Sequence, residues 1–309
     1  MDRTPIVPPP LAAGARVALV APAGPLRDEA DVERAIANTR ALGWEPMPGA
    51  HLRAHHGYVA GTDAERAADV NAAIRDPRID AIWCVRGGYG SARILDAIDY
   101  DALRAHPKTI VGYSDITALH CAIWARARLV TYHGPTGRGA LSDFSRASLE
   151  RAVTRGSDPC GTAPNARALA GGSARGRIAG GNLALVASLV GTPYALDPAG
   201  AILFFEDVNE PTYRIDRMLT QLRLAGVLAK CRGLIFGQFT ERTESADDAA
   251  MLDEVMRGAA AAVDGPCFMN APIGHVADQW TIPLGVDVTV EVSGQRSDVR
   301  VTSANRGSP

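Results

Sequence analysis

The sequence predicts an α/β fold in which an N-terminal, doubly wound parallel-sheet domain precedes a mixed α/β domain of swivelling, barrel-like form. In the first half, short apolar runs alternate with helix-type segments, the pattern of strands that lie in a parallel sheet. In the second half, the strict alternation of residues 286–292 indicates antiparallel strands. A chain of 309 residues is long enough for two such domains.

Strands in the first half are expected at three apolar runs, residues 16–21, 81–85 and 108–112. Helices are expected between and after them. Apolar positions from Val32 to Leu42 fall on one helical face, and Thr62 with Glu65 forms a capping box that begins a second helix. A third helix is expected over residues 115–126.

The alternation of apolar runs with helix-type segments is not visible in residues 137–175, which are rich in Ser, Ala, Gly, Pro and Arg. We therefore predict an N-terminal domain over residues 1–136, a linker over 137–175 and a C-terminal domain over 176–309. In the C-terminal domain we expect a helix at 182–190, a helix from Pro211, and strands at 201–205, 233–239 and 286–292. The Pro-rich first ten residues and those after Val301 are expected to form loose tails.

Charge and composition exclude several classes of partner. The net charge is -2 and both signs are interleaved, so no basic face is available for nucleic acid. No run approaches the roughly 20 apolar residues of a membrane span, and no signal-peptide pattern opens the chain, so we expect a cytoplasmic protein without a membrane partner. The five cysteines are scattered without a C-x-x-C pair, which favours reduced thiols over disulfides or zinc ligands.

Ser114 stands between an apolar strand and a predicted helix, in the sequence Gly-Tyr-Ser-Asp. A serine at such a turn can present its hydroxyl at the sheet edge while the N–H groups that open the helix face a developing oxyanion. A helix N-cap without chemistry is the simpler interpretation of this tetrapeptide alone. The G-x-S-x-G elbow of the α/β-hydrolases is absent.

The segment from Arg86 to Ser91 (RGGYGS) also ends a predicted strand and would lie on the same sheet edge as Ser114. Its glycines allow backbone N–H groups to approach a substrate, and Arg86 could bind a carboxylate with two hydrogen bonds. A tight turn without function and a phosphate-binding loop are the alternatives. The second is disfavoured because neither common phosphate-loop motif is present.

Two of the seven histidines are candidates for the site. His133 ends a strand on the functional edge and is a candidate substrate contact. His275 lies in a Gly- and Pro-flanked loop from which a side chain can point into a cleft, although a surface histidine without a role is the simpler interpretation of this residue alone. No H-E-x-x-H pattern accompanies the histidines of the polar loop, His51, His55 and His56.

Glu206 ends the apolar run 202–205, where a carboxylate requires a partner. His275 could be that partner, since a carboxylate can fix the tautomer of an imidazole. Considered without further information, an arginine such as Arg214 or Arg217 is the simpler partner.

Five ordered segments together resemble the LD-carboxypeptidase family, which includes the microcin C immunity peptidases. The resemblance extends over residues 14–293 and is carried by residues 17–24 (VALVAPAG), 80–90 (DAIWCVRGGYG), 110–119 (IVGYSDITAL), 204–222 (FFEDVNEPTYRIDRMLTQL) and 272–285 (PIGHVADQWTIPLG). Residues 137–179 match no signature of the family.

The resemblance implies a Ser-His-Glu triad of Ser114, His275 and Glu206, and an oxyanion hole formed by the N–H groups of Gly88 and Asp115. It also implies a homodimer without metal or cofactor. The usual substrate of such enzymes is the muropeptide L-Ala-γ-D-Glu-meso-diaminopimelate-D-Ala, cut before the terminal D-Ala in cell-wall recycling. Substrate contacts are then expected from three residues, Arg86, Tyr89 and His133.

Two alternatives stay open. A self-immunity peptidase that cleaves acyl-adenylate analogues would need an aromatic side chain to stack on adenine, and Phe144 is the only large aromatic in residues 137–179. A non-catalytic binding protein that closes two domains on a small ligand would show no triad geometry.

Overall fold

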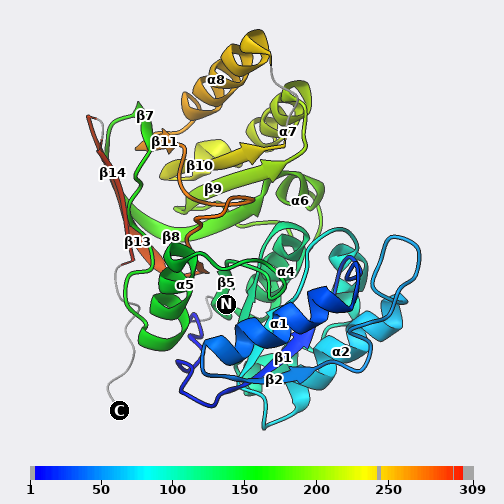
Figure 1. The fold of residues 1–309 in the computed structure, drawn as a ribbon. Coiled ribbons are helices and arrows are strands. Elements are labelled where there is room, and N and C mark those ends of the chain that lie inside the picture. Colours follow the sequence, from blue (N-terminus) through cyan, green and yellow to red (C-terminus); the bar gives the residue numbers. More distant parts are fainter. Residues whose placement is uncertain (1–3, 242–244, 295, 302–309) are drawn as a thin grey trace.

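The computed structural model describes residues 4–241, 245–294 and 296–301 of the chain. The predicted loose tail after Val301 therefore lies outside the described residues. Two lobes are stacked on each other, with the N-terminal half below and most of the C-terminal half above in Figure 1. None of the helices in the described ranges has the length and apolar character needed to traverse a bilayer.

The lower lobe is built on a six-stranded sheet. Its order is β12-β5-β4-β3-β1-β2, where β1 is Arg16–Val20, β2 Glu45–Pro48, β3 Ala81–Cys84, β4 Thr109–Gly112, β5 Thr131–His133 and β12 Ile282–Leu284. Strands β1 to β5 are parallel, whereas β12 comes from the other end of the chain and pairs antiparallel with β5. The predicted parallel sheet is therefore confirmed, with one added antiparallel strand.

Helices cover both faces of this sheet, so the lobe is doubly wound as predicted. One face carries α1 (Glu29–Ala41), and the other carries α2 (Asp63–Arg75), α3 (Tyr100–Ala105), α4 (Thr117–Ala127) and the turns η1 (Ser91–Ala97) and η2 (Ser114–Ile116). Side chains alternate along a strand, so Val17 and Leu19 pack on the α1 side while Ala18 and Val20 pack on the other. This two-sided burial explains why the strand is a continuous apolar run.

The upper lobe is built on an eight-stranded mixed sheet. From one edge to the other the strands are β6 (Gly161–Thr162), β14 (Arg296–Val301), β13 (Asp287–Ser293), β8 (Gly172–Asn182), β9 (Ile202–Val208), β10 (Gly233–Thr240), β11 (Cys267–Met269) and β7 (Arg167–Ala170). The strands β8 to β11 are parallel and the outer pairs are antiparallel. The sheet curls until β7 contacts β13 and β14. Its convex face is covered by α6 (Leu183–Ser188), α7 (Thr212–Leu224), the turn η4 (Leu228–Lys230) and α8 (Ala246–Ala260).

Two segments are more ordered than we expected. Residues 137–175, predicted as a linker, contain α5 (Asp143–Glu150), the turn η3 (Arg151–Arg155), β6, β7 and the start of β8. These short strands lie at or near sheet edges, so they lack the apolar alternation that would identify them. At the Pro-rich start, Ile6 pairs with Leu129 through backbone hydrogen bonds to Arg128 and Val130. The prediction of a loose N-terminal tail is therefore wrong from Ile6 onward.

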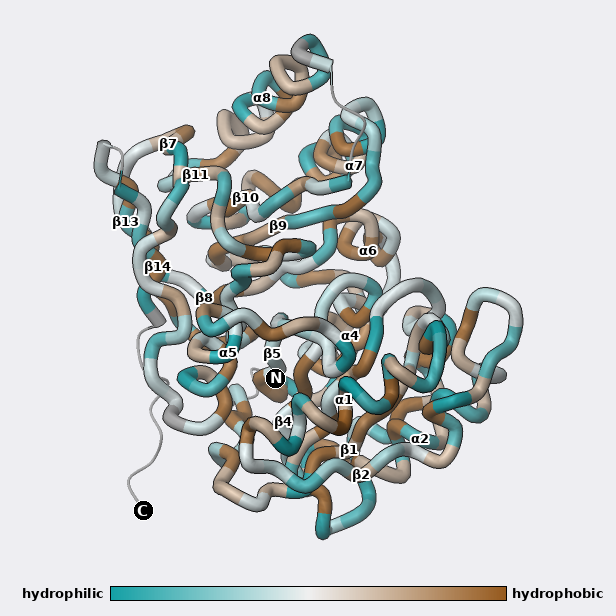
Figure 2. The backbone as a smooth tube through the Cα atoms, in the orientation of Figure 1, coloured by the Kyte–Doolittle hydropathy of each residue, from teal (hydrophilic) through white to brown (hydrophobic). Residues whose placement is uncertain are grey.

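A single hydrophobic cluster extends through both lobes. It joins Trp83, Tyr132 and Ile282 of the lower sheet to Phe204 and Ile235 of the upper sheet. Figure 2 shows apolar stretches inside both lobes and hydrophilic stretches on their outer loops. The lobes therefore share a core, and burial of this shared surface fixes their relative position.

We predict that Phe204→Ala lowers the free energy of unfolding by about 3–5 kcal/mol, because it opens a cavity in the shared core. Phe204 is fully buried and its ring centroid lies 5.1 Å from that of His133. Urea denaturation measures the change. Tyr213→Ala is the control, since Tyr213 is 60% exposed. Equal effects of the two substitutions would contradict a shared core at this position.

Candidate active site

Ser114 lies at the sharp turn between β4 and α4, at the carboxyl edge of the lower sheet. Its φ of 64° is in the left-handed region, which a non-glycine residue rarely adopts and which is enriched at active sites. The glycine-rich loop packs directly on it, since a Cβ on Gly87 would lie 2.9 Å from the Ser114 Cβ. Only a glycine at position 87 permits this approach.

Two side chains of the upper lobe complete a chain of hydrogen bonds with Ser114. His275 Nε2 lies 3.2 Å from Ser114 Oγ, and the His275 Nδ1–H donates to Glu206 Oε2 at 2.9 Å. The Glu206 side chain is fully buried on β9, whereas 19% of the His275 side chain is exposed. A hydrogen bond to the carboxylate fixes the tautomer in which Nε2 is free to accept a proton.

The loop that carries His275 is held against Glu206. The backbone of Gly274 has φ +104°, and a Cβ at this position would lie 2.5 Å from Glu206 Oε2. On one side of the loop, Gln238 N donates to Ile273 O at 2.9 Å, and β10 thereby ties the loop to the upper sheet. Glycine at position 274 therefore permits the carboxylate to reach the imidazole.

The imidazole of His275 packs against an aromatic ring of the lower lobe. Tyr113 lies with its ring centroid 4.8 Å from that of His275, and the edge of His133 lies against Tyr113 at 5.9 Å. His133 is fully buried, and burial, with the nearby His120 and His275, holds its pKa well below the usual value. The substrate contact predicted for His133 is therefore wrong in this structure, because Tyr113 and Phe204 cover its ring.

Two backbone segments lie next to Ser114 in the lower lobe, the glycine-rich loop and the turn η2. Gly88 follows Gly87 in the loop that packs on Ser114, and its N–H has no acceptor among the described residues. Asp115 lies in the first turn after the nucleophile candidate, where N–H groups lack intrahelical partners. These are the two N–H groups that the family resemblance implies as oxyanion donors.

The glycine-rich loop is held by contacts of three side chains that sequence analysis missed. Arg66 of α2 is buried, and its Nη1 donates to Pro22 O at 2.6 Å and to Gly90 O at 2.8 Å. Ser91 N donates to the Asp115 carboxylate at 2.8 Å, and Ser91 Oγ donates to Asp115 O at 2.5 Å. The segments that carry the two N–H donors are thus joined in one hydrogen-bonded unit. A charged residue on the apolar face of α2 was the available signal for Arg66.

A second buried network lies behind Glu206. Asp207 accepts hydrogen bonds from Asn182 Nδ2 at 2.8 Å and from Ala184 N at 2.9 Å. Asn182 N in turn donates to Thr117 Oγ1 at 3.0 Å, close to Ser114 in the lower lobe. Burial, and next the charge of Glu206, raises the pKa of Asp207 to about 6. Two acidic residues in succession on a buried strand were the signal for this network.

The other predicted residues lie around this centre. Tyr89 is 54% exposed and its ring packs edge-on against Tyr58 at 5.3 Å. Arg86 donates to the carbonyl of Pro25. Arg214, the arginine partner considered for Glu206, instead lies 3.5 Å from Glu210.

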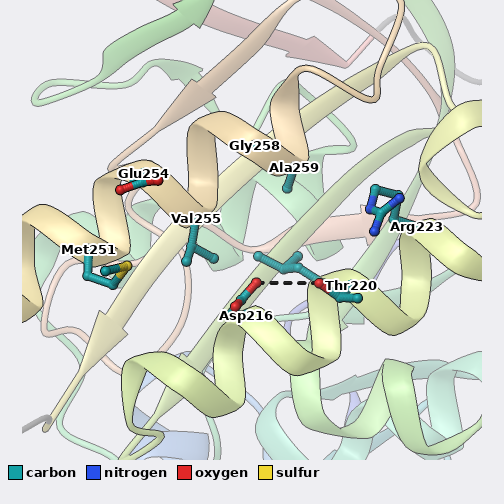
Figure 3. Close-up of a pocket in the computed structure, with 9 residues that line it drawn as sticks. Asp216, Thr220, Arg223, Met251, Glu254, Val255, Gly258 and Ala259 are labelled. Atoms are coloured by element: carbon teal, nitrogen blue, oxygen red, sulfur yellow. Dashed lines mark hydrogen bonds between the residues drawn. The ribbon is translucent and has the colours of Figure 1, made fainter.

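A separate hollow lies on the upper lobe between α7 and α8. Figure 3 shows Met251 and Val255 of α8 facing α7, where Thr220 Oγ1 donates to Asp216 at 3.4 Å. None of the residues that line this hollow belongs to the predicted site.

The site thus brings together a serine hydroxyl, an imidazole and a buried carboxylate in hydrogen-bonding order. The chain matches the model of the LD-carboxypeptidase N-terminal domain over residues 17–134 and that of the C-terminal domain over residues 175–290. The chain belongs to the LD-carboxypeptidase family and is a peptidase.

Relatives cover most of the chain. A protein of Streptomyces coelicolor named as a carboxypeptidase is 39% identical over 92% of this chain and 93% of its own length. The murein tetrapeptide carboxypeptidase of Pseudomonas aeruginosa is 35% identical over 89% of this chain and 93% of its own. Among solved structures, the muramoyltetrapeptide carboxypeptidase of Oxalobacter formigenes is 28% identical with a TM-score of 0.81, covering 93% of this chain and 98% of that one.

We predict that Arg66→Met lowers peptidase turnover on the order of 10- to 100-fold with little change in KM, because a displaced loop misplaces the Gly88 N–H. Steady-state kinetics at a temperature where the variant is folded tests this. Arg93→Met is the matched control, since Arg93 is exposed and also pairs with Asp63. A variant that loses stability but retains full turnover would show that Arg66 only supports the fold.

The pKa of Asp207 predicts a pH-dependent stability. An unfolded aspartate has a pKa of about 3.9, so the folded state holds the proton more tightly. The associated stability is fully present below about pH 4 and is lost as the pH rises through about 6. Asp207→Asn should reduce the loss of unfolding free energy between about pH 4.5 and about pH 7 by on the order of 1–2 kcal/mol. Urea denaturation at both values, with exposed Asp278→Asn as control, measures it. An unchanged pH slope would refute the prediction.

Proposed function

We propose that this protein is a serine carboxypeptidase that hydrolyses the bond before the terminal D-Ala of murein tetrapeptides, with Ser114 as nucleophile, His275 as general base and Glu206 as its orienting carboxylate. The observation that carries the proposal is the continuous hydrogen-bond chain from Ser114 Oγ through His275 to Glu206. The sequence relatives named as carboxypeptidases support the substrate class.

The chemistry follows from this chain of contacts. His275 Nε2 accepts the Ser114 proton as Oγ attacks the carbonyl carbon of the penultimate residue. The N–H groups of Gly88 and Asp115 stabilise the oxyanion. The imidazolium then protonates the departing amine of D-Ala, and water hydrolyses the acyl-enzyme with His275 again as base. Glu206 stabilises the imidazolium that forms twice in this cycle.

We assign the nucleophile to an N-terminal domain of residues 1–136 and the other two members of the triad to a C-terminal domain of residues 176–309. The family resemblance extends the proposal to a cytoplasmic homodimer that acts in peptidoglycan recycling.

The two alternative functions have less support. Phe144, on which stacking against an adenine would depend, packs partly buried against the shared core. A non-catalytic binding protein gives no reason for a strained serine within 3.2 Å of an imidazole.

We expect the protein to release D-Ala from L-Ala-γ-D-Glu-meso-diaminopimelate-D-Ala, and Ser114→Ala to reduce that release by at least about 1000-fold. The free energy of unfolding should change by less than about 1 kcal/mol, since alanine fits the same turn. Mass spectrometry measures the product, and an aminoacyl-adenylate analogue is incubated in parallel. Ser188→Ala, on an exposed part of α6, is the control. Cleavage of the adenylate analogue alone, or full activity of Ser114→Ala, would reject the proposal.

A further inference from the structure

Two arginines converge on the segment that precedes α1, beside the glycine-rich loop. Arg86 donates to the carbonyl of Pro25, and Arg138 Nη1 lies 3.3 Å from the carboxylate of Asp31. The Arg27 N–H donates to the same carboxylate at 3.1 Å, which places a third arginine in this segment. We call Arg27, Arg86 and Arg138 the arginine cluster.

The cluster lies next to the proposed oxyanion hole. Gly24 N donates to Gly87 O at 2.9 Å, and a Cβ on Gly24 would lie 3.5 Å from Arg86 Nε. A Cβ on Gly87 would lie 3.1 Å from Ser114 Oγ, so the loop that begins with Arg86 contacts both the Gly24 segment and the proposed nucleophile. Arg138 N donates to Val85 O at 3.3 Å, which places Arg138 at the end of the same strand.

Positive charge in the cluster is only partly balanced. Asp31 is buried, and it is shared between Arg138 and Arg34. No carboxylate within the described ranges pairs with Arg86. Burial, and then the charges of Arg138 and Arg27, lowers the pKa of Arg86. Cations held together in this way are stabilised when an anion binds between them.

We propose that the arginine cluster binds the terminal carboxylate of the peptide substrate, with Arg86 and Arg138 as its direct ligands. The inference rests on the proposed function, since it places the free carboxylate of D-Ala. In such a substrate the terminal carboxyl carbon is separated from the scissile carbonyl carbon by three bonds. A carbonyl oxygen bound at Gly88 therefore brings the carboxylate within reach of the adjacent cluster. Guanidinium groups bind carboxylates with two parallel hydrogen bonds, which selects a free acid over an amide.

The kinetic test compares the tetrapeptide as a free acid with the same peptide ending in D-alaninamide. The wild-type protein should prefer the acid on the order of 10- to 100-fold in kcat/KM, and Arg138→Gln should abolish most of that preference. Turnover of the amide by Arg138→Gln should fall far less than turnover of the acid, and circular dichroism with urea denaturation shows that the variant is folded. Arg53→Gln removes the same charge from an exposed pair with Glu29 and should keep the preference.

A binding test separates this inference from the proposed reaction. In the Ser114→Ala background, calorimetry should show tighter binding of the acid than of the amide, and addition of Arg138→Gln should remove the difference. Equal binding of acid and amide by Ser114→Ala, or an unchanged acid preference in Arg138→Gln, would overturn the arginine cluster as the carboxylate site. Selective binding of the acid without turnover by the wild-type protein would instead overturn the proposed reaction and leave the cluster assignment intact.

Discussion

The contact between Ser114 and His275 depends on how the two lobes are fixed to each other, because each lobe supplies one of the two residues. The segment that carries His275 is tied on one side to β10 through Ile273 and continues on the other into β12, which pairs with β5 of the lower sheet. The shared hydrophobic cluster surrounds this crossing segment. A gap of 3.2 Å between hydroxyl and imidazole is thus maintained by packing and strand pairing rather than by the two side chains alone.

Much of the fold could be predicted from the sequence because its central strands are buried on both faces. Residues 17–20 and 202–205 are continuous apolar runs, and in the structure successive side chains of each run pack into different hydrophobic clusters. The short strands of residues 161–170 could not be predicted, since edge strands need no apolar alternation. The pairing of β12 with the lower sheet could not be predicted either, because the sequence Ile-Pro-Leu does not indicate which sheet it joins.

The site was predictable to the extent that it follows strand ends. Ser114 and the Arg86 loop both follow strands of one parallel sheet, so their proximity follows from topology. The choice of His275 and Glu206 came from the ordered resemblance, since each residue alone has a simpler interpretation. The position of Arg66 on the apolar face of α2 indicates a buried charge, but not its role, because the carbonyls of Pro22 and Gly90 that it binds carry no sequence signal.

The pairing of β12 with β5 also has a consequence for the order of folding. Residues 282–284 pair with residues 131–133 across a large separation in sequence, so the edge of the lower sheet stays open until both lobes have met. Contacts between residues far apart in the chain form slowly, because the loop between them must first be closed. The approach of His275 to Ser114 is therefore expected among the late events of folding.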